Sequence, residues 1–172
     1  MNISIRKCTI QDLDILLEYA VETFYQTFAH LNTAEDMEKY IEAAFNEDKL
    51  RCELENPDSS FFFLFADGCL AGYMKLNEAP SQTDINDCES LEIERIYISR
   101  DFQSRGLGRY LMQQAVFVAS ERGKKYIWLG VWEKNEKAIC FYKKNGFSII
   151  STHSFFLGED EQTDYIMRRN LK

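Results

Sequence analysis

Short runs of alternating apolar and polar residues, and longer runs with helical spacing, divide the chain into a regular series of elements. The shorter runs predict strands at residues 2–8, 61–66, 69–76, 91–99, 126–132, 147–157 and 164–169. The longer runs predict helices from an N-cap pair at Thr9 and Asp12 to about residue 28, at 33–56 with a break near 46–56, at 108–122 and at 135–145. The order β-α-α-β-β-β-α-β-α-β-β predicts one α/β domain over residues 1–172, built on a mixed sheet.

Residues that start and stop elements support this division. Asn32 or Thr33 is expected to cap the second helical stretch. Asp67-Gly68 predicts a tight hairpin turn, and Gly146 is expected to end the last helix in a left-handed conformation. The polar residues 158–162 predict the loop between two closing antiparallel strands.

Charge narrows the classes of partner. The formal net charge is −8, so the chain lacks the basic face of a duplex-DNA binder, and no nucleic-acid partner is expected. An acidic surface instead attracts cations, including cationic small molecules.

The longest strongly apolar run, residues 61–66, is far too short to span a bilayer, so no membrane partner is expected. No secretory signal is visible at the N-terminus, which predicts a cytoplasmic protein.

Metal and disulfide chemistry find no support in the sequence. The five cysteines are scattered, odd in number and free of any C-x-x-C pair, and His30 and His153 lie far apart. No zinc-ligand spacing is present, so no metal is expected. The cysteines are interpreted as reduced thiols that behave as small hydrophobic residues.

A glycine-containing loop, Gln103-Ser104-Arg105-Gly106-Leu107-Gly108, joins the strand at 91–99 to the long helix at 108–122. Backbone N–H groups at a helix start lack internal partners, and the helix dipole adds partial positive charge there, which favours an anion. Glycine lets a diphosphate approach the backbone without meeting a Cβ atom. The third glycine of a dinucleotide fingerprint is replaced by Leu111, and the P-loop lysine is absent. Alone, this loop fits an anion site and a simple turn into a core helix equally well.

The surroundings of the loop are more specific. The strand 92–98, the loop 103–108 and the segment 128–147 together resemble the GCN5-related N-acetyltransferase (GNAT) family. In that family Q/R-x-x-G-x-G/A holds the pyrophosphate of coenzyme A, and N-x-x-A-x-x-x-Y-x-x-x-G-F supplies the rest of the cofactor site. Both patterns are matched here. The resemblance implies the GNAT fold, a central mixed and mostly antiparallel sheet flanked by helices, with acetyl-CoA as cofactor.

The resemblance extends to one branch of the family. Residues 89–98, 127–136 and 158–164 are similar to the PaiA-type bacterial spermidine/spermine N-acetyltransferases. This implies acetyl transfer to a primary amine of a polyamine or a similar small amine. Two alternatives stay open: a protein N-terminus or lysine as the acceptor, and a regulatory protein that binds acetyl-CoA without turnover. The family often forms homodimers, so a homodimer is one expected state.

Acetyl transfer to an amine requires removal of a proton. An alkylamine with a pKa near ~10.4 costs roughly 4 kcal/mol to deprotonate at neutral pH, so a carboxylate that takes the proton matters. Period-two alternation places Glu92 and Glu94 on one face of their strand, with Leu91, Ile93, Arg95 and Tyr97 on the other. By resemblance, Glu92 stands where some family members carry the general base, and Glu94 is a near-equal candidate. Alternatively, one or both glutamates pair with a neighbouring cation.

Tyr142 is the candidate acid. In the family the matching tyrosine protonates the departing coenzyme A sulfur, and a phenol is a suitable donor to a thiolate. On spacing alone, Tyr142 shares a helix face with Ile139 and is better explained as a core aromatic; the resemblance reverses that preference.

The resemblance also implies the cofactor site. Backbone groups of 96–98 are expected to pair with the pantetheine amides as an added strand. Asn135 is a helix N-cap that in relatives also contacts the pantetheine arm. The expected cofactor-binding residues are Ile96, Tyr97, Ile98, Gln103, Ser104, Arg105, Gly106, Leu107, Gly108, Arg109, Asn135 and Lys144. Substrate cations are assigned to the helix segment 18–25 and the acidic loop 159–161.

Overall fold

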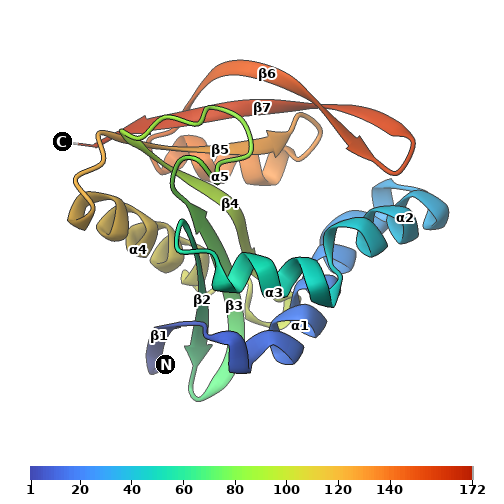
Figure 1. Ribbon diagram of the computed structural model, residues 1–172, viewed down its shortest axis with the longest axis horizontal. Helices are drawn as coiled ribbons and strands as arrows, with labels where there is room; N and C mark the ends of the chain where they lie inside the picture. Colours follow the sequence, from blue (N-terminus) through green and yellow to red (C-terminus); the bar gives the residue numbers. More distant parts are fainter. Residues whose placement is uncertain (172) are drawn as a thin grey trace.

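The computed structural model describes residues 1–171, and the chain forms a twisted sheet with helices against both faces (Figure 1). The strands are β1 (Ile3–Lys7), β2 (Ser59–Ala66), β3 (Cys69–Asn77), β4 (Ser90–Ile98), β5 (Tyr126–Trp132), β6 (Ser148–Leu157) and β7 (Asp160–Asn170). The helices are α1 (Leu13–Phe28), α2 (Ala34–Ala44), α3 (Glu47–Glu55), α4 (Leu107–Glu121) and α5 (Glu136–Lys144). Short 3-10 turns η1 (Ile10–Asp12), η2 (Ala29–Leu31) and η3 (Arg100–Phe102) connect them. The predicted fold class is confirmed.

The sheet runs in the order β1-β2-β3-β4-β5-β7-β6. Every neighbouring pair is antiparallel except β4 and β5, which are parallel. Their pairing covers only Ser90–Glu92 of β4 against Tyr126–Trp128 of β5. Beyond Glu92 the two strands diverge in the middle of the sheet, and this divergence positions the functional site.

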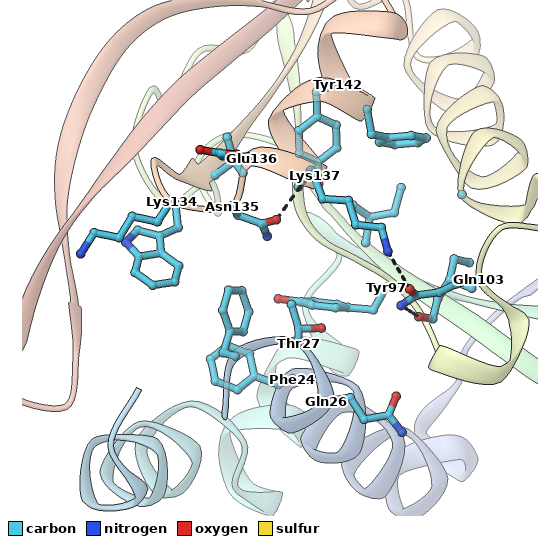
Figure 2. A pocket seen from close by; sticks show the side chains of 18 of the residues that line it. Phe24, Gln26, Thr27, Tyr97, Gln103, Lys134, Asn135, Glu136, Lys137 and Tyr142 are labelled. Carbon is cyan, nitrogen blue, oxygen red and sulfur yellow. Dashed lines mark hydrogen bonds between the residues drawn. The ribbon is translucent and has the colours of Figure 1, made fainter. Parts of the chain in front are cut away.

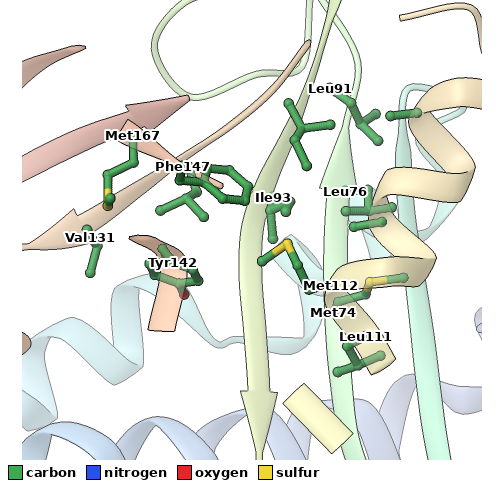
Figure 3. Close-up of a cluster of buried hydrophobic side chains, with 14 of the residues drawn as sticks. Met74, Leu76, Leu91, Ile93, Leu111, Met112, Val131, Tyr142, Phe147 and Met167 are labelled. Atoms are coloured by element: carbon green, nitrogen blue, oxygen red, sulfur yellow. The ribbon is translucent and has the colours of Figure 1, made fainter. Parts of the chain in front are cut away.

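Two hydrophobic clusters hold the helices to the sheet. One lies beneath α4 and α5 and includes the side chains labelled in Figure 3. The other lies beneath α1, α2 and α3, with Tyr73 and Phe61 fully buried in it. Burying one large aliphatic or aromatic side chain contributes about 1.5–3 kcal/mol. These apolar faces therefore fix the positions of the helices that border the cleft.

A bulge in β4 corrects the predicted face assignment of that strand. Lys75 of β3 pairs with Arg95, but the next residue, Leu76, pairs with Ile93, so Glu94 has no partner opposite it. The extra residue shifts the alternation by one position. Tyr97 therefore packs with the cluster under α1–α3, whereas Ile93 packs with the cluster under α4 and α5. The prediction that Arg95 and Tyr97 share a face with Ile93 was wrong.

The helical stretch after α1 is interrupted, as its polar residues allow. The Thr33 hydroxyl accepts a hydrogen bond from the Asp36 N–H and caps α2. The Asn46 side chain then caps α3 by accepting from the Lys49 N–H at 2.9 Å. Three helices rather than two thus lie between β1 and β2, because Asn46 stops one helix and starts the next.

The C-terminal hairpin also differs from the prediction. Residues 160–162 belong to β7, and the turn consists of Gly158 and Glu159 alone. This turn reaches α2, where the Glu159 N–H donates to Asp36 at 3.1 Å and Glu159 pairs with Lys39 at 2.8 Å. Figure 1 shows the β6–β7 hairpin extending over to α2. The hairpin therefore ties the last strands to the N-terminal helices on one side of the cleft.

Candidate active site

A cleft of about 1040 Å³ opens where β4 and β5 diverge (Figure 2). Its walls come from β4, the loop before α4, the end of β5, the start of α5, and the C-terminal half of α1. Because the sheet splits here, backbone groups from its interior face the cleft. Such a split is a natural site for an extended ligand.

The edge of β4 that faces β5 fits the pantetheine arm of coenzyme A. β3 pairs with one edge of β4 as far as Ile98, whereas β5 leaves the other edge after Glu92. Ile96, Tyr97 and Ile98 all line the cleft. Peptide-like amides can add to such an edge as an extra strand. The residues present therefore suit the amide groups of the cofactor.

The start of α4 fits the pyrophosphate. Ser104 and Gly106 have φ values of +60° and +83°, and the first helical hydrogen bond runs from the Tyr110 N–H to the Gly106 carbonyl at 3.1 Å. The N–H groups ahead of Tyr110 are the unpaired ones of a helix start. Gly106, Leu107 and Gly108 line the cleft. A diphosphate can approach these donors closely.

Three side-chain contacts hold the parts of this cofactor region together. Gln103 donates from Nε2 to the Ile98 carbonyl at 3.1 Å, and its Oε1 accepts from Lys137 Nζ at 3.1 Å. Asn135 caps α5 by accepting from the Ala138 N–H at 3.2 Å. Figure 2 shows all three contacts bordering the cleft. They fix α5 relative to the end of β4.

Tyr142 lies on the inner face of α5 and lines the same cleft. Its side chain is buried against Phe141 and Phe147, with ring centroids 5.5 and 6.0 Å away. Burial raises the pKa of the Tyr142 phenol to about 12. The phenol therefore keeps its proton throughout the physiological range and can donate it.

Glu94 and Glu92 occupy different environments. Glu94 lines the cleft, whereas Glu92 is enclosed and does not. Burial alone would raise the pKa of Glu94, but the charges of Arg95 and Lys75 outweigh it and lower the pKa. Burial raises the pKa of Glu92, although hydrogen bonds to its carboxylate oppose that change. Glu94 is thus held as a carboxylate at the wall of the cleft.

A buried polar network connects the two glutamates. Asn77 Nδ2 donates to Glu92 at 2.9 Å and to Glu94 at 2.6 Å. Thr83 donates to Glu92 from both its backbone N–H and its hydroxyl. Lys75 approaches Glu94 at 2.5 Å. The predicted pairing with neighbouring cations is therefore present for Glu94, while Glu92 is satisfied by neutral donors.

The other end of the cleft is aromatic. The rings of Phe24 and Tyr40 stack at 4.7 Å, Tyr40 lies 5.5 Å from Phe155, and Phe28 lies 6.4 Å from Trp132. All five side chains line the cleft. Aromatic faces attract alkylammonium groups, so this end suits a cationic acceptor.

Several predicted residues lie outside the cleft wall. Arg105, Arg109 and Lys144 do not line it, and neither do the acidic residues of the segments 18–25 and 159–161. Of the predicted residues, those that do line it are Glu94, Ile96, Tyr97, Ile98, Gln103, Ser104, Gly106, Leu107, Gly108, Asn135 and Tyr142, together with Phe24 of the segment 18–25.

The sequence reasoning missed other cleft residues. Arg100, Lys134 and Lys137 are the lysine and arginine side chains that line the cleft within residues 1–171. Asp164 on β7 also lines it, although it was assigned only to a closing strand. For Lys134 and Lys137 the position beside Asn135 was an available signal. For Asp164 the sequence offered none, because its place depends on how the C-terminal hairpin folds back.

Neither a metal centre nor a membrane segment emerges from the described residues. Within 1–171, no group of three or more histidine, cysteine or acidic side chains is arranged to hold a metal ion. The helices of this range are too short or too polar to cross a bilayer.

Comparisons with known proteins agree with this geometry. The model of the acetyltransferase (GNAT) family matches residues 16–147. An uncharacterised N-acetyltransferase from the pepI 3′ region of Lactobacillus delbrueckii subsp. lactis is 43% identical over 99% of this chain and 98% of its own length. Spermidine N(1)-acetyltransferase of Thermoplasma acidophilum is 28% identical over 100% of this chain and 99% of its own.

A solved structure agrees as well. The PaiA N-acetyltransferase from Thermoplasma acidophilum, in complex with coenzyme A, superposes with a TM-score of 0.81 at 28% identity. The match covers 99% of this chain and 100% of that one. The family model, the full-length relatives and the split sheet lead to one conclusion. The chain belongs to the GNAT family and is an acetyl-CoA-dependent N-acetyltransferase.

Proposed function

We propose that this enzyme acetylates a primary amine of a polyamine such as spermidine or spermine. The observation that carries the proposal is the acceptor end of the cleft, where five aromatic rings surround a space also lined by the carboxyl groups of Glu94 and Asp164. Carboxylates and aromatic faces are the groups that hold alkylammonium ions. The net charge of −8 favours the approach of such cations. The similarity to a spermidine N(1)-acetyltransferase supports the same substrate class.

The cofactor is proposed to lie along β4 with its pyrophosphate at the start of α4. The free edge of 96–98 would bind the pantetheine amides, and the N–H groups of Gly106 to Gly108 would bind the diphosphate. Lys137 and Arg100 line the cleft, and we assign them to neutralise phosphate charge. When bound, acetyl-CoA supplies an activated acetyl thioester.

The enzyme must take a proton from the acceptor ammonium before the amine can attack. Glu94 is the β4 carboxylate that lines the cleft, so we assign it to this role, directly or through a water molecule. Its low pKa favours holding and orienting the amine over strong basicity. Glu92 supports it through the shared Asn77 amide.

Tyr142 is proposed to give its proton to the departing sulfur. The phenol is protonated at neutral pH because its pKa is about 12, and a proton donor at this point stabilises the thiolate as it forms. The tyrosine lies on α5, whose start is fixed by the Asn135 cap and by the Lys137–Gln103 contact. These contacts hold the donor in place.

An amine panel tests the proposal. Coenzyme A release should be measured with acetyl-CoA and spermidine, spermine, simple monoamines, and peptides with a free N-terminus or lysine. We expect spermidine and spermine to give the highest kcat/KM. Preference for peptides would replace the polyamine assignment with a protein acceptor. Tight acetyl-CoA binding without turnover of any amine would contradict it.

A further inference from the structure

Asp164 lines the cleft, is half-buried and has no ion-pair partner among residues 1–171, whereas the other unpaired acid of the cleft, Glu136, is exposed to solvent. Its Oδ1 atom is buried and has no hydrogen-bond partner among residues 1–171, and no ion pair within that range includes it. Glu94, by contrast, pairs with Lys75 and Arg95, and Glu92 accepts from Asn77 and Thr83. A carboxylate that is partly removed from water and has no partner is stabilised when a cation binds to it.

The surroundings of Asp164 suit an ammonium group. Asp164 lies opposite Trp132 in the β5–β7 pair and opposite His153 in the β6–β7 pair. His153 directs Nδ1 toward Asp84, 3.2 Å away, and makes no hydrogen bond with Asp164. Trp132 lines the same cleft, and Lys134 Nζ already lies 5.6 Å from its ring centroid, which shows that the ring accepts an ammonium group. One carboxylate and one aromatic face together form a minimal site for an alkylammonium ion.

Gly130 keeps the space beside this carboxyl open. It is exposed, lines the cleft, and lies on β5 next to Trp132 in the alternation. A Cβ atom at position 130 would lie 3.6 Å from Asp164 Oδ2 and 4.0 Å from His153 Cε1. The absence of a side chain there leaves room for a ligand atom at contact distance from the carboxyl.

We infer that Asp164, together with Trp132, binds the second ammonium group of the acceptor, the one that is not acetylated. This inference rests on the proposed polyamine function and assigns the specificity of its site. The reacting end is marked by Glu94 and Tyr142, which lie on β4 and α5. Asp164 comes from β7, on the other side of the divergent strands. An acceptor with two cationic groups would contact both Glu94 and Asp164, whereas a monoamine would leave Asp164 without a partner.

The test compares Asp164→Asn with the unmodified enzyme on 1,4-diaminobutane, spermidine and n-butylamine. We expect KM for spermidine and the diamine to rise about 10- to 100-fold, as for loss of one charge-assisted hydrogen bond, with kcat little changed. The KM for n-butylamine should stay within about twofold. Glu161→Gln removes an equal charge from an exposed position on the same strand and should change none of these values.

Three outcomes would overturn the inference. If KM for spermidine is unchanged in Asp164→Asn, the subsite is elsewhere, although the polyamine function stands. If kcat falls equally for mono- and diamines, Asp164 acts at the reacting end. If the unmodified enzyme turns over no polyamine, the proposed function itself fails.

Calorimetric binding of acetyl-CoA and the melting temperature of each variant show whether Asp164→Asn has folded. Gly130→Ala, which keeps the charge and fills the space, should reproduce part of the KM effect.

Discussion

The Tyr142 phenol illustrates how burial alone prepares a side chain for chemistry. Burial between α5 and the core raises its pKa to about 12. We predict that Tyr142→Phe lowers kcat with spermidine by about 100-fold, because only the proton donor is lost. The KM for acetyl-CoA should stay the same. Steady-state rates of coenzyme A release, measured at several acetyl-CoA concentrations, give both constants.

The matched control for that experiment is Tyr110→Phe. Tyr110 packs against the same core from α4 but does not line the cleft, so its variant should keep normal turnover. Full activity in Tyr142→Phe would remove the tyrosine from the acid role.

The ionisation of Asp164 should also affect the stability of the folded protein. Burial raises its pKa from 3.8 to about 6, so the native protein holds a proton that the unfolded chain has already lost. Native stability is therefore penalised as pH rises from about 4 through 6. Asp164→Asn removes the penalty. Its melting temperature should exceed that of the unmodified protein at pH 8, by roughly 2–4 °C for each kcal/mol.

The same difference should become small at about pH 3, because the carboxyl then holds its proton in both the folded and the unfolded protein. Thermal unfolding at the two pH values measures it, with Glu161→Gln as the charge control. An equal shift at both pH values would show that packing, not ionisation, governs this position.

Individual residues differed in how far the sequence could place them. Gln103, Gly106, Asn135 and Tyr142 occur within local motifs, and all line the cleft. Whether Glu92 or Glu94 faces the cleft could not be predicted, because it depends on a one-residue irregularity in strand pairing. Asp164 could not be predicted either, since its function requires a pocket assembled by other elements.

Among the elements, the start of α4 is the one expected to bind the diphosphate of the cofactor. Gly106 and Gly123 both have positive φ, +83° and +66°, and a Cβ on either would meet nothing within 4 Å. Alanine at either position should therefore cost a similar 1–2 kcal/mol of folding stability. We predict that only Gly106→Ala also raises the KM for acetyl-CoA, because Gly123 lies at the far end of α4.

Thermal unfolding together with acetyl-CoA titration separates the two effects. If both variants bind acetyl-CoA equally well, the α4 start does not hold the diphosphate. The helix would then be a core element preceded by an ordinary turn.

Elements with strong local signals were predicted well, and irregular ones were not. The Asp67-Gly68 hairpin, α4 and β5 lie where periodicity placed them. The β4 bulge escaped prediction because periodicity assumes uninterrupted pairing, whereas Glu94 is displaced by the register of β3. Residues 160–162 read as a loop because they are polar, yet they pair with the edge strand β6 and need no apolar face.

For the whole molecule, the net charge of −8 should accelerate capture of polycations. We predict that kcat/KM for spermidine falls several-fold between ~20 mM and ~500 mM salt, because added salt shortens the screening length from well above 10 Å to a few Å. The decrease for n-butylamine should be smaller, in proportion to its single charge. Initial rates at low substrate concentration measure both. Equal salt dependence for the two amines would contradict electrostatic capture of the polycation.

The half of the cleft proposed to bind the cofactor and the half proposed to bind the acceptor are built from different parts of the chain. The cofactor half uses β4, α4 and α5, whose motifs lie between residues 92 and 147, so resemblance to a family could locate it. The acceptor half joins Phe24 of α1, Trp132 of β5 and Asp164 of β7. These positions are brought together only by the order of strands in the sheet and by the hairpin that reaches α2. Local sequence patterns therefore could not predict that these three residues line one cleft.

The central claim, that this cleft transfers acetyl from acetyl-CoA to a polyamine, is tested most directly by identifying the product. Spermidine and acetyl-CoA should be incubated with the unmodified enzyme and with Tyr142→Phe, and coenzyme A and acetylspermidine quantified by mass spectrometry. We predict equal amounts of the two products, formed about 100-fold more slowly by Tyr142→Phe. Release of coenzyme A without acetylspermidine, or its formation at equal rates by both proteins, would contradict it.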